Sequence, residues 1–83
     1  MTKPTVHLNG TSRESLLNDY VSACDALREA IEAVASAAPN ARDYYVQPGD
    51  AYVNARREHE NRLSFLVQIR NQMEQLAEHV AGE

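Results

Sequence analysis

Two long stretches of apolar residues, spaced alternately three and four apart on either side of Pro39, constrain the fold of this 83-residue chain most strongly. Such spacing lines apolar side chains along one face of an α-helix. Proline disfavours helical geometry in the residue before it, so the first helix must end near position 38. We therefore expect an all-α fold, a long antiparallel two-helix hairpin with an ordered corner loop. The expected bounds are 12–38 for the first helix, 39–49 for the loop and 50–81 for the second helix.

The first expected helix opens with a capping box, in which Thr11 and Glu14 satisfy each other's backbone N–H groups. Its heptad positions a and d carry apolar or aromatic residues throughout, namely Leu17, Tyr20, Cys24, Leu27, Ile31, Val34 and Ala38. Position g adds Leu16, Ala23, Ala30 and Ala37. This apolar face is wider than a helix with a single neighbour requires. We therefore expect the hairpin to assemble as a homo-oligomer, a dimer or a larger helical bundle.

The chain's small size leads to the same expectation. A domain this short is marginally stable without disulfides, bound metal or oligomerisation. Its single Cys excludes an internal disulfide, and the sequence contains neither a CxxC nor an HxxxH pair for a structural zinc site. Residues 1–10 have no helical period and contain Pro4 and an Asn9-Gly10 turn signal, so we expect an N-terminal arm or a disordered tail before the hairpin domain of residues 11–83.

The second expected helix has an unusual first half. From Leu63 onward, its a and d positions carry ordinary core residues. Before Leu63 the same face carries Tyr52, Arg56, His59 and Arg62, where a plain coiled coil would carry leucine or isoleucine. An unpaired buried charge is costly. This end of the face is therefore solvated, internally paired or a binding site.

The stretch from Pro39 to Arg62, which we call the corner, is the candidate functional region. It holds four of the chain's eight Lys and Arg residues and three of its four Tyr. Guanidinium groups bind phosphate in a bidentate manner, and tyrosine rings stack on bases. This combination favours a small anionic, nucleotide-like ligand. The candidate ligand-binding residues are Arg42, Tyr44, Tyr45, Tyr52, Arg56, His59 and Arg62.

Two other interpretations of the corner remain open. In the first, the polar residues form a structural network, with Arg56 or Arg62 paired with Asp43, Asp50 or an acid of another subunit, and with His59 as a hydrogen-bonded interior residue. In the second, the corner is a surface for a partner protein, and the chain acts as an inhibitor or assembly factor.

Catalysis is the least favoured class of function. Glu58, His59 and Glu60 are consecutive residues of a helix, so their side chains do not converge on one point. Cys24 has no activating base beside it. We expect no catalytic residues, no metal site and no cofactor.

The charge and the hydropathy of the chain limit the cellular location and the classes of partner that we expect. A net charge of −4 and an isoelectric point near 5.3 argue against general nucleic-acid binding and against an anionic membrane surface. No apolar run approaches the roughly 20 residues that span a bilayer, and no signal peptide is recognisable. We expect a cytoplasmic protein.

The run Arg42-Asp43-Tyr44-Tyr45-x-Gln47, followed by a Pro/Gly pair and a helix start with His59 and Arg62, resembles a family of small phage and prophage proteins. The family pattern is R-D-Y-Y-P-Q followed by a helix with H-x-x-R, and the resemblance covers roughly the second half of the chain. Val46 replaces the usual proline, and Pro48-Gly49 stands in inverted order, so the loop geometry of this chain can differ. The family has no established activity, and the resemblance implies a phage origin and the corner as the feature shared with the family.

A looser likeness, in size, hairpin form and Arg/Tyr corner, is to phage hairpin proteins that oligomerise and sequester nucleotide second messengers of bacterial immunity. No motif matches, so this likeness is an analogy and assigns no residue roles. It favours a non-catalytic protein that captures a nucleotide-like ligand near a subunit interface in the cytoplasm of the infected bacterium.

Overall fold

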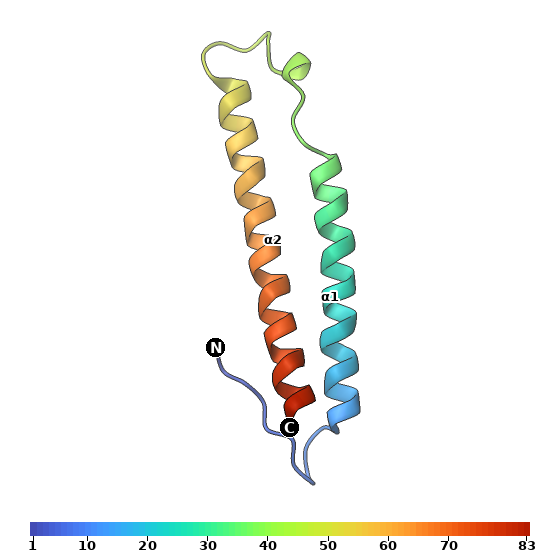
Figure 1. Cartoon of the computed structure of the whole chain (residues 1–83). Coiled ribbons are helices and arrows are strands. Elements are labelled where there is room, and N and C mark those ends of the chain that lie inside the picture. The colour runs from blue at the N-terminus through green and yellow to red at the C-terminus, as the bar shows by residue number, and fades with distance from the viewer.

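The computed structural model describes residues 1–83 and is a hairpin of two long helices (Figure 1). Helix α1 spans Arg13–Ser36, a short 3-10 helix, η1, spans Ala41–Asp43, and helix α2 spans Ala51–Gly82. The two long helices lie side by side and antiparallel, and the chain contains no strand. The expected all-α hairpin is therefore confirmed.

The ends of α1 differ by one or two residues from the expected bounds. Ser12 is the N-cap, and its hydroxyl oxygen accepts a hydrogen bond from the backbone N–H of Ser15 at 3.1 Å. The predicted capping box of Thr11 and Glu14 is therefore wrong. At the other end, α1 stops at Ser36 because Pro39 restricts the backbone of the residue before it.

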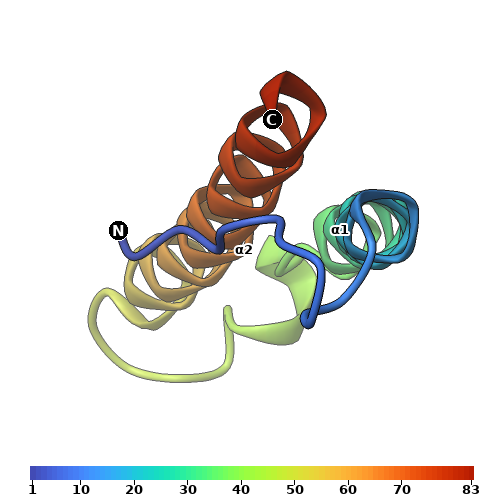
Figure 2. The same cartoon turned by 90° about the horizontal axis from the view of Figure 1, so that it is seen from below.

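The N-terminal arm, residues 1–10, turns back beside the C-terminal end of α2 (Figures 1 and 2). His79 Nε2 lies 2.9 Å from the carbonyl oxygen of Pro4 and 2.9 Å from Glu83 Oε1. Pro4 is half-buried, and Val80, the neighbour of His79, has no exposed surface. The arm is thus attached to α2 by a hydrogen bond between residues distant in sequence.

The hairpin has very little core. His59, Leu76 and Val80 are the only buried residues, and α1 contributes none. The chain measures 62 × 21 × 17 Å, and its radius of gyration of 18.4 Å exceeds the value of about 12 Å for a compact domain of this length. Each long helix therefore packs along one side only, and its other sides face outward.

The face that α2 turns toward α1 differs from the predicted one in the middle of the helix. Heptad position a lies inward as expected, and Leu76 at position d is buried, but in the middle of the helix the half-buried residues beside the a column are Leu63 and Arg70, at position e. Arg62, at position d, is exposed, and so is Ile69, seven residues later. Burying Leu63 in place of Arg62 avoids burying a charge, and a straight helix must then turn Arg70 inward as well. The prediction that Arg56 and Arg62 lie on the inward stripe is wrong, because both are exposed.

Candidate functional site

The corner loop is ordered by its own backbone. The side-chain oxygen of Asn40 accepts a hydrogen bond from the Arg42 N–H at 3.1 Å and caps η1. The N–H groups of Tyr44 and Tyr45 both donate to the carbonyl oxygen of Ala41. Gly49 adopts a φ of +70°, a left-handed conformation that residues with a Cβ rarely take, just before α2 begins. These turns direct Tyr44 back toward the first turn of α2.

Three side chains meet at this end of the hairpin, and we call them the Tyr/Arg cluster: Tyr44 from the loop, and Tyr52 and Arg56 from α2. The ring centroids of Tyr44 and Tyr52 lie 6.2 Å apart, with their planes inclined by 47°. The guanidinium carbon of Arg56 lies 5.8 Å from the centroid of the Tyr52 ring, within cation–π range. The corner loop thus folds back onto the first turn of α2 through Tyr44.

His59 lies one turn after Arg56 and is buried between the helices. Its Nε2 atom is enclosed and has no hydrogen-bond partner in the chain. The interpretation of His59 as a hydrogen-bonded interior residue is therefore wrong for Nε2. Such an unsatisfied buried nitrogen costs free energy unless a further group reaches it.

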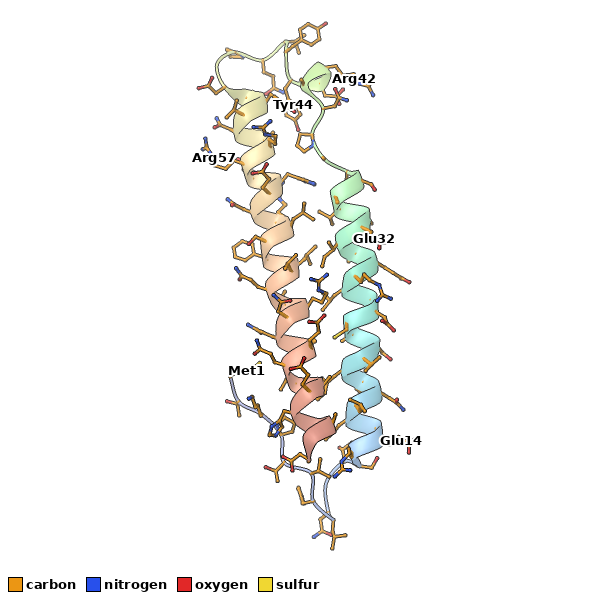
Figure 3. All side chains as sticks on the ribbon, in the orientation of Figure 1. Met1, Glu14, Glu32, Arg42, Tyr44 and Arg57 are labelled. Carbon is orange, nitrogen blue, oxygen red and sulfur yellow. The ribbon has the colours of Figure 1, made fainter.

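The other three candidate residues do not join the Tyr/Arg cluster. Arg42 and Arg62 are exposed, and Tyr45 retains 79% of its surface. Figure 3 shows Arg42 and Arg57 pointing outward on opposite sides of the corner, while Tyr44 lies inside it. One chain thus brings together Tyr44, Tyr52 and Arg56 and leaves Arg42, Tyr45 and Arg62 on the outer surface.

The predicted pairs between corner arginines and Asp43 or Asp50 do not form. Arg56 Nε lies 3.9 Å from Glu60 Oε1, and this is the only ion pair of the corner. Arg42, Arg57 and Arg62 have no acidic partner within the chain. These arginines therefore do not form a salt-bridge network within one chain.

Arg70 is a polar residue between the helices that the heptad assignment placed outside the seam. Its Nε is enclosed and lies 3.7 Å from Glu74 Oε1, while more than half of the Glu74 side chain is exposed. The half-buried Cys24 lies near both residues. Burial raises the pKa of the Cys24 thiol, and the carboxylates of Glu74 and Asp25 raise it further. The thiol is thus not activated as a nucleophile.

No pocket is present on the hairpin, and no three His, Cys, Asp or Glu residues are grouped so that they could hold a metal ion. Neither helix has the length and apolar character that a membrane span requires. The Tyr/Arg cluster is therefore an open surface in a single chain.

The chain was compared with known proteins by sequence and by structure. No protein-family model, no curated protein and no solved structure matches it.

Proposed function

We propose that the chain is a non-catalytic binding protein that sequesters a small, planar, anionic ligand of the nucleotide class at the corner, close to a subunit interface. The observation that carries the proposal is the Tyr/Arg cluster, with its rings 6.2 Å apart and its guanidinium group 5.8 Å from the Tyr52 ring. An aromatic face beside a cation suits the base and the phosphate of a nucleotide.

The weak pairing of the corner arginines supports anion binding. The one ion pair, between Arg56 and Glu60, is 3.9 Å long, and both side chains are more than half exposed. Exposed pairs of this kind contribute at most about 1 kcal/mol, so a phosphate can displace Glu60 at little cost. The four arginines of residues 39–62 are matched by four acids, so binding rests on short-range contacts and not on long-range attraction.

The proposal includes a homo-oligomer. Binding sites for small molecules usually enclose most of the ligand, and one chain offers no pocket. A second chain next to the corner would close the site and would bring the outward-facing Arg42 or Arg62 within reach of the ligand. The proposed setting is the cytoplasm of a phage-infected bacterium, with a nucleotide second messenger of immune signalling as the ligand.

Isothermal titration with a panel of linear and cyclic nucleotides tests the proposal. At least one nucleotide is expected to bind, and Arg56→Ala is expected to remove about 1.5–3 kcal/mol, which is roughly a ten- to hundredfold weaker affinity. Tyr44→Ala and Tyr52→Ala remove stacking and are expected to weaken binding about tenfold. Arg28→Ala is the matched control, because Arg28 is an exposed arginine in the middle of α1, paired with Asp25.

Two results would count against the corner as a ligand site. The first is the absence of heat with every nucleotide of the panel. The second is an affinity that is the same for the wild type and for the Arg56 and Tyr variants.

A second candidate function is a protein interaction module. Tyr45 and Val46 retain 79% and 75% of their surface at the tip of the corner loop. Tyrosine is enriched among the residues that dominate protein–protein binding energy. If this function is correct, one host or phage protein will co-purify with the wild type but not with the Tyr45→Ser/Val46→Ser variant. Co-purification that survives the double substitution argues against this loop as the docking surface.

A further inference from the structure

One side of the hairpin carries an exposed apolar patch around its middle, which on α2 ends at Arg62 and Gln72. On α1 it consists of alanines spaced three and four apart at heptad positions c and g. On α2 it consists of Phe65 and Ile69, which retain 63% and 43% of their surface. The alanines of this apolar side are Ala26, Ala33 and Ala37, which are exposed, and Ala23 and Ala30, which are half-buried.

The two halves of the apolar side belong to one surface. In an antiparallel helix pair, the g columns of both helices lie on the same side of the seam. Phe65 is at position g of α2, and Ile69 is at the adjacent position d on that flank. No charged residue interrupts the alanine column between Ala23 and Ala37. The large apolar side chains of α2 thus lie beside a column of small, uncharged residues on α1.

The exposed area of the chain indicates how much surface a partner would cover. The hairpin exposes 6089 Å², whereas a compact protein of 9.3 kDa is expected to expose about 5,000 Å². The difference is about 1,100 Å². A standard protein–protein interface buries about 800 Å² on each partner. One neighbour of ordinary interface size would therefore remove most of this excess.

We infer that the apolar side is the interface with a second copy of this chain. A surface with large side chains on one flank and alanines on the other is self-complementary, because a two-fold axis places the large residues of each copy over the alanines of its partner. Phe65 and Ile69 of one chain then pack against the α1 alanines of the other. The product is a four-helix bundle in which α1 has neighbours on two sides.

This interface rests on the homo-oligomer proposed above but not on its ligand. Analytical ultracentrifugation of the nucleotide-free protein tests it. The wild type is expected to sediment with the mass of two 9.3 kDa chains or a multiple of two. Phe65→Glu and Ala33→Glu are each expected to halve that mass, because each buries a charge at the interface, and circular dichroism will show whether the helices are retained.

Val21→Glu is the matched control. Val21 is an apolar residue that retains 46% of its surface, but it lies at position e of α1, on the opposite side of the hairpin. This variant is expected to keep the wild-type mass. A monomeric wild type at tens of micromolar overturns the inference. So does an assembly that survives Phe65→Glu and Ala33→Glu, because another surface must then hold the copies together.

Discussion

His59 is the most informative single residue, because its imidazole is buried and its Nε2 has no partner. A protein selected only for stability would have little reason to keep a polar ring at this position, where leucine fits the heptad. The nearby Tyr/Arg cluster suggests such a reason, although Nε2 is enclosed, so a ligand at the corner reaches it only if the two helices separate there. Residues that cost stability without a ligand are common at functional sites.

Replacing each of the two histidines of α2 by leucine tests whether His59 lowers the stability of the ligand-free protein. His59→Leu removes an unsatisfied polar group and is expected to raise the free energy of unfolding by about 1 kcal/mol. His79→Leu is the matched control, because His79 Nε2 has partners in Pro4 and Glu83. It is expected to lower the free energy of unfolding by about 1 kcal/mol.

Urea denaturation of the ligand-free protein, with the protein concentration kept the same for all variants, measures both changes in the free energy of unfolding. If His59→Leu proves destabilising to the same degree as His79→Leu, then Nε2 of His59 is already satisfied in the assembled protein. Its availability to a ligand would then be excluded.

Among the structural elements, the two helices were the part that the sequence predicted best. A three-and-four spacing and Pro39 suffice for their number, length and orientation, because they depend on local backbone rules. The inward column of α2 was not predictable in the same way. In the middle of α2, position d offers Ile69 but also Arg62, and position e offers Leu63 but also Arg70, so either choice turns one arginine toward α1.

The candidate site was predictable in composition but not in arrangement. The residue types of the corner indicated an anion-binding, aromatic site, and Tyr44, Tyr52 and Arg56 do come together. The direction of Arg42 and Tyr45 depends on the turns of η1 and on the hydrogen bonds to Ala41. Those bonds involve backbone atoms, which residue type alone does not specify.

The corner loop itself provides a test at the scale of the element. Gly49 has a φ of +70°, and a Cβ at this position would meet no atom within 4 Å. Gly49→Ala is therefore expected to lower the free energy of unfolding by about 1 kcal/mol, and this loss comes from backbone strain alone. Gly82→Ala is the control, since Gly82 ends α2, has equally open surroundings and is expected to gain slightly in stability.

Thermal unfolding of the two alanine variants checks this contrast. Equal melting temperatures for Gly49→Ala and Gly82→Ala would mean that the loop relaxes to another conformation. In that case the placement of Tyr44 against Tyr52 would not depend on the turn at Gly49.

As a whole molecule, the single hairpin is incomplete in two respects. Its core is limited to three buried residues, and its candidate site is an open surface without a pocket. Association through the apolar side would correct the first deficiency. A neighbouring chain near the corner would correct the second, so assembly and ligand capture are linked in this account. The unit that binds a nucleotide is then the oligomer.

Native mass spectrometry with added nucleotide tests this claim most directly, because it resolves the number of chains and the number of bound ligands in one spectrum. We expect ions of two 9.3 kDa chains, or of a multiple of two, that retain nucleotide, and single chains that retain none. Nucleotide bound to single chains, or oligomers that bind none of the panel, would contradict it.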